Sequence, residues 1–292
     1  MKQFLLFIGK ILLVLLLSAF ALDFIYTTVL AQSETRNKVE NVMNSKPQNY
    51  DVIILGTSRA INHFVSVLFE KQGIKTFNYG MSGAHLFETS LMLKLMIERG
   101  WKIKNVIVET DLNLSNEKRD DGTFGRFMPF MHSSKTITEH FKNESDFTEL
   151  YYVPFYRYIQ FDAKVGFRAW YKTLVNEPTT ILANDGYYPL GYNPKASMKN
   201  NIESLVPLRN RYFEEIKQLC KVNNINLIAV TTPMCSNVKG MDYFKKVKTL
   251  YPEIKEYEHV VEGDEYFSSC GHLNDKGARL YTKKIIDDLF KK

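Results

Sequence analysis

Hydrophobic residues are concentrated first at the N-terminus of the chain. The stretch from residue 3 to residue 31 contains two charged side chains, Lys10 and Asp23, and Ile11–Leu22 carries no charge at all. A helix over Ile11–Leu30 would be about 30 Å long, which is enough to cross a bilayer. It would place Asp23 in the apolar layer, where a carboxylate costs about 2.5–3.5 kcal/mol.

Lys2 and Lys10 lie on the N-terminal side of this stretch. The positive-inside rule keeps that end in the cytoplasm and sends the remainder across the membrane. We expect a signal anchor, or transmembrane segment, over residues 1–32. A cleaved signal peptide is the alternative, because Ala19–Ala21 and Val29–Ala31 both have the small-x-small form that signal peptidase reads. Either one places the domain outside the cytoplasm, in the periplasm or at the cell surface, whereas a buried helix of a cytosolic protein would not.

Beyond a polar linker at residues 33–50, apolar strands alternate with amphipathic helices. This alternation predicts a parallel sheet with helices on both faces, an α/β three-layer sandwich with a mostly parallel sheet over residues 51–292. The last helix is expected to turn Leu280, Ile285, Ile286 and Leu289 toward the core. The predicted elements are strand Asp51–Gly56, helix Ala60–Gln72, strand Lys75–Tyr79, helix Ala84–Arg99, strand Asn105–Thr110, helix Leu205–Val222, strand Ile225–Thr231 and helix Lys276–Lys291.

The alternation is interrupted at about residues 115–204. This stretch is rich in aromatic side chains and is predicted to be a partly helical insertion carried at the top of the sheet. Flat aromatic rings near an active site suit carbohydrate, whose sugar faces stack on them. The alternative is that the rings form a small helical core of their own. The aromatic residues include Phe124, Phe127, Phe130, Tyr151, Tyr152, Phe155, Tyr156, Tyr158, Phe161, Phe167, Trp170 and Tyr171.

Composition excludes several classes of partner and cofactor. The net charge is +6, but Lys and Arg are scattered among Asp and Glu, without the basic stripe that a nucleic-acid interface requires. Cys220, Cys235 and Cys270 are odd in number and widely spaced, which argues against a disulfide framework and a zinc site. The histidines fit no metal-ligand spacing. We therefore expect no metal, no cofactor and no nucleic-acid partner.

Polar residues follow the predicted strands at the edge where parallel sheets bind ligands. Ser58 stands after the first strand at the start of a helix, where backbone N–H groups favour developing negative charge, and Gly56 permits a tight turn. Taken alone, a serine at this position is more often only a helix N-cap. However, Asn78–Gly83 follows the second strand, Asn113 follows the third, and His272 precedes the last helix.

Ser58, Gly83, Asn113 and His272, in this chain order, resemble the four motif blocks of the SGNH (GDSL-like) hydrolase superfamily. The resemblance covers about residues 51–113 and 225–291 and implies a flavodoxin-like sheet. Membrane-anchored members include esterases and O-acetyltransferase-like proteins that modify bacterial surface polysaccharides. It further implies that Ser58 is the nucleophile and His272 the general base. The backbone N–H of Ser58, with Gly83 and Asn113, would form the oxyanion hole.

The chain departs from the family at the catalytic acid. The family has Asp three residues before the histidine, where this chain has Ser269. A hydroxyl can fix the tautomer of the imidazole but offers no charge to the imidazolium; in the serine-protease triad, replacing the acid by its amide lowers kcat about ten-thousand-fold. Asp264 and Asp111 are the carboxylates considered as substitutes. Another interpretation is a retired active site on a retained fold.

Substrate binding is assigned to Arg59 and Asn78, although a residue at the position of Arg59 also commonly packs or forms an ion pair at the helix start. The sequence leaves undecided whether Cys235 and Cys270, which flank the predicted site, form a disulfide.

Two functions are consistent with the sequence. The first is an extracytoplasmic, serine-dependent esterase or O-acyltransferase acting on cell-envelope or exported polysaccharide. The second is a catalytically weakened or inactive protein of the same fold that binds a glycan or assembles with other envelope polysaccharide-assembly proteins. Ser269 favours the second; the order of Ser58, Gly83, Asn113 and His272 favours the first.

Overall fold

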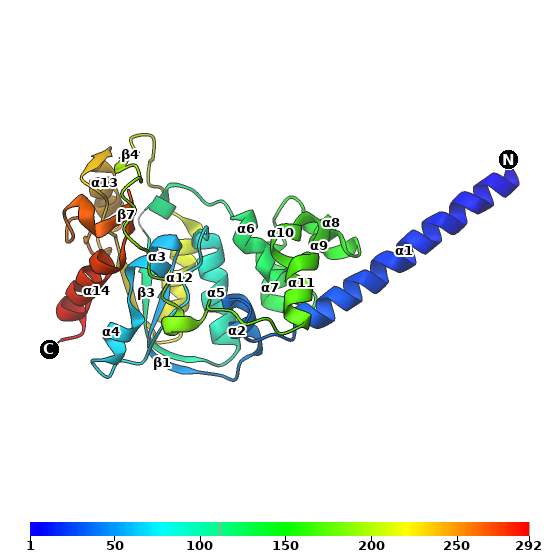
Figure 1. Cartoon of the computed structure of the whole chain (residues 1–292), viewed down its shortest axis with the longest axis horizontal. Coiled ribbons are helices and arrows are strands. Elements are labelled where there is room, and N and C mark those ends of the chain that lie inside the picture. The colour runs from blue at the N-terminus through cyan, green and yellow to red at the C-terminus, as the bar shows by residue number, and fades with distance from the viewer. Residues whose placement is uncertain (111, 292) are drawn as a thin grey trace. The chain divides into compact units, whose positions relative to one another are not determined.

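The computed structural model describes residues 1–110 and 112–291, which form two compact units (Figure 1). The helical unit consists of Met1–Ser45 and Asp121–Thr179, and the sheet unit consists of Lys46–Asp120 and Thr180–Lys292. The stretch expected as one insertion is therefore divided between the two. Residues 121–179 belong with the N-terminal helix, whereas residues 115–120 and 180–204 belong with the sheet.

The sheet unit is built on four parallel strands in the order β2-β1-β3-β5. The expectation of an α/β domain with a mostly parallel central sheet is thus confirmed. The register places Ile54 beside Asn78 on one side and Ile107 on the other, so the carboxyl ends of the strands share one edge. The strands are β1 (Asn49–Leu55), β2 (Thr76–Asn78), β3 (Lys102–Glu109) and β5 (Asn226–Val230).

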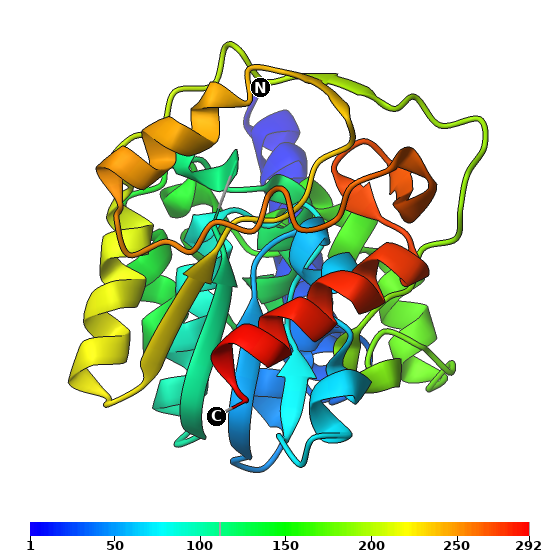
Figure 2. The same ribbon diagram turned by 90° about the vertical axis from the view of Figure 1, so that its left-hand side faces the viewer.

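Helices cover both faces of this sheet, because alternate side chains of the strands are buried on each side. On one face, α3 (Ser58–His63), α4 (Ser66–Glu70) and α14 (Asp275–Leu289) pack over the strands, and Figure 2 shows α14 crossing them. The second face is covered by α5 (Leu86–Glu98) and α12 (Arg211–Val222), which meet through the rings of Phe87 and Tyr212. The first face buries Val52, Ile54, Ile107, Ile228 and Val230 against Phe64, Phe69, Tyr281 and Ile285.

Three sequence-based expectations about helices are wrong in detail. The helix expected over Ala60–Gln72 is broken at Phe64 and Val65, which are extended and fully buried, and the N–H of Val65 donates to Thr282 Oγ1. α12 begins at Arg211 rather than Leu205, because the Asn210 side chain caps its first turn. On α14, Ile285 and Ile286 are buried as expected, Leu289 is partly buried, and Leu280 is exposed.

Short elements complete the sheet unit and carry several of the predicted site residues. Two of them, β7 and β8, form an antiparallel hairpin directly before α14. These elements are η1 (Leu112–Ser115), η3 (Ala183–Gly186), β4 (Lys199–Asn201), β6 (Asn237–Lys239), α13 (Asp242–Leu250), η4 (Asp264–Tyr266), β7 (Phe267–Ser269) and β8 (His272–Leu273).

The helical unit has an aromatic core. Phe124 lies against Phe141 and Phe161 with ring centroids 4.3 and 5.2 Å apart, and these rings are buried. For these residues the core interpretation is confirmed, whereas Tyr152, Phe167 and Tyr171 are exposed. The helices of the unit are α1 (Lys2–Leu30), α2 (Lys38–Asn44), α6 (Asp121–Phe124), η2 (Gly125–Phe130), α7 (Lys135–Phe141), α8 (Phe147–Tyr152), α9 (Tyr156–Gln160), α10 (Asp162–Val165) and α11 (Phe167–Leu174).

The N-terminal helix α1 has two different parts. Large apolar side chains are exposed along it from Phe4 to Ile25, and by length and composition the helix is able to span a membrane. Its last turns pack into the helical unit, where Leu30 is buried. Asp23 marks the change, because its carboxylate is the counterion of Arg157, whose side chain is only 1% exposed.

The Asp23 carboxylate organises the chain around Arg157. Asp23 Oδ1 accepts from Arg157 Nη2 at 2.7 Å, and Oδ2 accepts from the backbone N–H of Phe155 at 2.8 Å. Phe155 has a φ of 67°, a left-handed conformation that is unfavourable for a bulky residue. Thr27 adds a second bond from α1 by accepting from the same Arg157 nitrogen. α1 is therefore fixed to the helical unit by a buried polar network rather than by apolar contact alone.

Replacing Asp23 by Asn is expected to destabilise the helical unit. The amide keeps an acceptor for Phe155 but leaves the buried guanidinium of Arg157 without a counterion, a loss of about 3–5 kcal/mol. The measurement is resistance of residues 121–179 to limited proteolysis in detergent. Glu139→Gln, which breaks an exposed pair with Lys142, is the control and should change little. Equal protease resistance of D23N and the wild type would contradict the assignment.

Candidate active site

Ser58 is presented by a tight turn between β1 and α3. Gly56 has a φ of 138°, and an added Cβ would lie 2.9 Å from Glu109 Oε2, so only glycine fits there. Thr57 caps α3 by accepting the N–H of Arg59 at 3.1 Å. Its own backbone N–H and hydroxyl donate to Glu109 Oε2 at 3.0 and 2.7 Å. The buried Glu109, at the end of β3, therefore fixes the conformation of the serine turn.

The structure brings Ser58 and His272 together. Ser58 Oγ and His272 Nε2 are 2.8 Å apart across 214 residues of sequence. On the other side of the imidazole, Nδ1 lies 3.3 Å from Ser269 Oγ. Ser58, His272 and Ser269 thus form a continuous line of polar groups, with Ser58 and His272 each partly exposed. A hydroxyl whose oxygen lies within reach of an imidazole nitrogen is the arrangement needed to activate a nucleophile.

A second histidine, His63, holds the first in place. It is fully buried at the end of α3, and its Nε2 accepts the backbone N–H of Leu273 at 3.0 Å. Its ring lies edge-on to the ring of His272, with centroids 6.4 Å apart. Burial, and then the charges of Arg59 and His272, keep the pKa of His63 well below its usual range. His63 is therefore a neutral acceptor that positions the residue next to His272.

The hairpin that carries His272 is also tied covalently. Cys270, between β7 and β8, forms a disulfide with Cys235, which lies after the end of β5. The Cys235–Cys270 disulfide, which the sequence leaves undecided, is thus present, and Cys220 is a free, buried cysteine. Because Cys270 is two residues from His272, the disulfide fixes the hairpin that carries His272 to the sheet edge.

Gly83 and Asn113, the predicted oxyanion-hole residues, lie after β2 and β3. Gly83 has a φ of 89°, and an added Cβ would lie 2.8 Å from Asp120 Oδ1, so glycine is required there. The loop that contains it is tied to the serine turn, because the N–H of Met81 donates to the carbonyl of Gly56. Asn113 is largely buried on η1, with its Oδ1 3.0 Å from His85 Nδ1.

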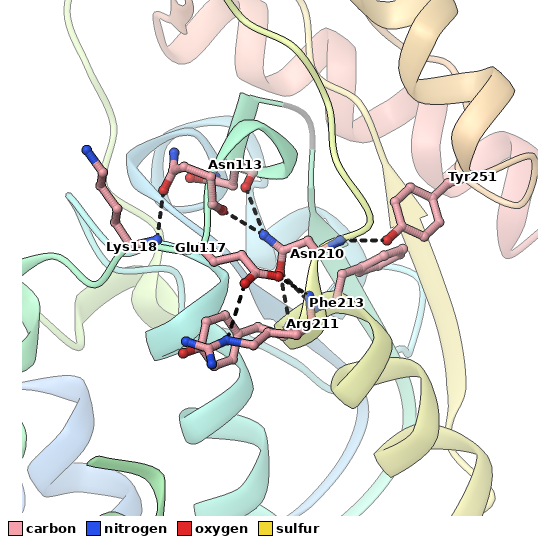
Figure 3. A network of polar contacts seen from close by, with 9 residues as sticks. Asn113, Glu117, Lys118, Asn210, Arg211, Phe213 and Tyr251 are labelled. Carbon is pink, nitrogen blue, oxygen red and sulfur yellow. Dashed lines mark hydrogen bonds and ion pairs between the residues drawn. The ribbon is translucent and has the colours of Figure 1, made fainter. Parts of the chain in front are cut away.

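Asn113 is also held from behind by Asn210 (Figure 3). Asn210 Nδ2 donates to the carbonyls of Asn113 and Asn116 at 3.4 and 2.7 Å, while its Oδ1 accepts from the first turn of α12. The N–H of Asn210 donates to the hydroxyl of Tyr251. This network fixes η1 to the start of α12 and so gives Asn113 a defined position after β3.

Arg59 and Asn78, predicted to bind substrate, are both buried and donate to backbone carbonyls. Arg59 is 5% exposed, and its Nη2 donates to the carbonyls of Thr232 and Pro233. Asn78 is fully buried, and its Nδ2 donates to the carbonyls of Ala60 and Phe64. Both side chains are used to join α3 to neighbouring strand ends, because backbone carbonyls left free at the helix break and after β5 need donors.

Asp264 and Asp111 are the two carboxylates considered as substitutes for the acid that the resemblance implies. Asp264 Oδ1 accepts from the N–H and hydroxyl of Ser236. Asp111 lies outside the described residues. Among the residues that the structure describes, no group of three His, Cys, Asp or Glu side chains is placed to hold a metal ion.

Glu109, Thr57 and His63 were not predicted as site residues. The signal for Glu109 is a carboxylate at the end of an otherwise apolar strand. His63 gives no such signal, because its partner, the N–H of Leu273, is 210 residues away. A scan against protein-family models and a search of curated proteins find no match to the chain.

Thr57→Val is expected to loosen the serine turn. It removes both the hydroxyl donor to Glu109 and the N-cap of α3, which together should lower the free energy of unfolding by about 1–3 kcal/mol. Thr57→Ser keeps the hydroxyl and is the matched control. Urea unfolding of the two variants measures the difference, and equal stabilities would show that the hydroxyl is not needed.

The stability of the protein should depend on the titration of His63. Its folded pKa is lowered, so its contribution is complete above the unfolded value of about 6.5 and is lost as pH falls below it, by up to about 1.4 kcal/mol per pH unit. His63→Gln keeps an acceptor for Leu273 but does not titrate. Urea unfolding between pH 5 and 7.5 should therefore give a shallower acid loss for H63Q than for the wild type. An unchanged slope would refute this role.

Proposed function

We propose that the chain is a serine-dependent esterase or O-acyltransferase of the SGNH-like, flavodoxin-like type, acting on acylated polysaccharide outside the cytoplasm. The observation that carries the proposal is the 2.8 Å separation of Ser58 Oγ and His272 Nε2. The resemblance of the four motif blocks to that superfamily agrees with this geometry. The role of Ser58 as nucleophile and His272 as base follows from the chemistry of the pair.

In the first half-reaction, Ser58 Oγ attacks the acyl carbonyl as its proton passes to His272 Nε2. The tetrahedral intermediate collapses when His272 returns that proton to the leaving alkoxide, and the acyl group stays on Ser58. Donors for the developing oxyanion are the backbone N–H of Ser58, with Gly83 and Asn113 as the family-derived candidates. Water or a sugar hydroxyl then repeats the sequence in reverse, so one site serves both hydrolysis and transfer.

Ser269 supports the tautomer that this reaction needs. When Nε2 of His272 accepts the proton of Ser58, Nδ1 carries the other proton. Ser269 Oγ, at 3.3 Å from Nδ1, is able to accept a hydrogen bond from this N–H. A hydroxyl orients the ring without supplying negative charge. This observation also favours the second candidate function, a catalytically weakened protein of the same fold that binds a glycan or assembles with other envelope proteins.

Two features support membrane anchorage with the site on the outer side. Cleavage after Ala31 would remove Asp23 and leave Arg157 buried without its counterion. The Cys235–Cys270 disulfide is a bond that persists in oxidising compartments, and Lys2 and Lys10 favour a cytoplasmic N-terminus. We therefore infer an uncleaved signal anchor and a periplasmic or cell-surface domain.

A cavity lined partly by residues that follow His272 in the sequence suits a sugar. It has a volume of about 430 Å³ and is lined by Tyr192, Glu265 and the segment Asn274–Lys276, which begins two residues after His272. Tyr192 is exposed, so its ring is available for stacking, and the carboxylates and Lys276 offer partners for hydroxyl groups. This combination of an aromatic face with polar groups is the basis for proposing a glycan substrate.

Ser58→Ala tests the proposal directly. The wild-type chain should react with a fluorophosphonate probe and hydrolyse p-nitrophenyl acetate; S58A should lose the labelling and fall to background, and His272→Gln should lose at least about a thousandfold in rate. Ser236→Ala, an exposed serine of the same unit, is the control. Unchanged hydrolysis in S58A would reject the enzyme, and an unlabelled wild type that binds acetylated polysaccharide saturably would favour the binding protein.

A further inference from the structure

The helical unit contains a cavity whose lining is strongly cationic. Its volume is about 320 Å³, and it is bounded by the end of α1 at Leu30, the start of α2, η2 and the α10–α11 segment. All of its lining residues belong to the helical unit. Five of them carry positive charge, namely Arg36, Arg126, Lys164, Arg168 and Lys172.

Only part of this charge is balanced within the unit. Lys172 forms an ion pair with Glu177 at 2.6 Å, and the Arg36 guanidinium donates to the carbonyl of Glu177. Of the described residues that line the cavity, Glu40 is the only acid. Lys164 and Arg168 are exposed, and no carboxylate is recorded within ion-pair distance of either among the described contacts. The cavity therefore favours an anion.

Glu40 contributes a buried polar group to the same cavity. Only 3% of the surface of Glu40 is exposed, and its Oε1 accepts a hydrogen bond from Asn37 Nδ2 at 2.7 Å. Among the described residues, Oε2 has no hydrogen-bond partner. Burial raises the pKa of Glu40 to about 7, so a protonated carboxyl, which is a donor rather than an anion, is well populated at neutral pH.

The position of the cavity along α1 matches the headgroup layer of a bilayer. Exposed apolar side chains of α1 end at Ile25, and the cavity begins at Leu30. Five residues of helix rise about 7.5 Å, which is close to the depth of the polar layer on one side of the hydrocarbon core. The cations therefore lie at the height of lipid phosphates when the apolar part of α1 spans the membrane.

We propose that this cavity binds the phosphodiester of an anionic phospholipid headgroup. Arg168 supplies planar, paired N–H donors that match phosphate oxygens, and Lys164 adds a mobile charge. The proposal rests on the membrane anchorage inferred above and is independent of the chemistry at Ser58. It gives the anchored chain a specific lipid contact in addition to the helix.

Titration calorimetry of the full chain in dodecyl maltoside micelles tests this site. The probes are dihexanoyl phosphatidylglycerol below its micelle concentration, the water-soluble glycerophosphoglycerol, and dihexanoyl phosphatidylcholine. The double variant K164Q/R168Q should bind phosphatidylglycerol at least about tenfold more weakly than the wild type. The control K135Q/K142Q removes two exposed lysines of the same unit that do not line the cavity, and should bind as the wild type does.

The pattern across probes identifies the source of the phosphate. Binding of both phosphatidylglycerol and glycerophosphoglycerol, lost in K164Q/R168Q, supports recognition of the phosphodiester itself; binding of the lipid alone, lost in the same variant, supports a headgroup that needs its acyl chains. No saturable binding, equal binding of phosphatidylcholine, or an equal loss in the lysine control would overturn the proposal. Fluorophosphonate labelling of K164Q/R168Q should stay unchanged, so this result and the failure of the Ser58 chemistry are distinguishable.

Glu40→Gln tests whether the buried Glu40 side chain contacts the ligand in the cavity. The groups that face Glu40 are Ser33, Arg36 and Asn37 from the segment before α2, and Arg126 from η2. The phosphodiester does not titrate near neutral pH, so the wild-type affinity should fall severalfold between pH 6 and pH 8 as Glu40 ionises, while E40Q should stay nearly constant. A wild-type affinity that is independent of pH, or that changes in E40Q to the same extent, would place the ligand away from Glu40 and overturn the assignment.

Discussion

The joint between α3 and the start of α14 is the constraint on which the candidate site depends. His63 contributes two hydrogen bonds to this joint: its ring accepts the N–H of Leu273, and its backbone carbonyl accepts the hydroxyl of Thr282. Thr282 Oγ1 in turn accepts the N–H of Val65. These bonds are available only because the helix stops at Phe64. A continuous helix would use the same backbone groups internally, and the two catalytic candidates would lose their common frame.

The serine and the histidine are positioned by different means. The serine turn is fixed by the sheet itself, through the Glu109 carboxylate at the end of the neighbouring strand. The histidine lies on a hairpin whose strands have three and two residues, which has little stability alone. It is held by His63, by the N-cap of Asn274 and by a disulfide. The buried carboxylate of Glu109 and the buried imidazole of His63 each accept a hydrogen bond from a backbone N–H, of Thr57 and of Leu273 respectively.

The sequence predicts the sheet well because β1, β3 and β5 each contain an unbroken run of three or more apolar residues, and a strand covered on both faces needs that pattern. It also identifies Ser58 and His272, since each stands where a strand or turn meets a helix. It does not predict the break at Phe64, because both residues there are apolar and suit a buried helix equally well. The carbonyl partners of Arg59 and Asn78 are not predicted, because polarity near a strand end does not distinguish a ligand contact from a carbonyl that needs a donor. The division of residues 115–204 depends on Asp23 pairing with Arg157 across 134 positions.

The disulfide beside His272 makes the restraint on this residue depend on the redox conditions around the chain. The serine turn depends on hydrogen bonds within the sheet unit and needs no redox change to form, whereas the hairpin has its covalent tie to Cys235 only when both cysteines are oxidised. Of the two facing residues, only His272 therefore depends on the oxidation state of cysteines for part of its positioning.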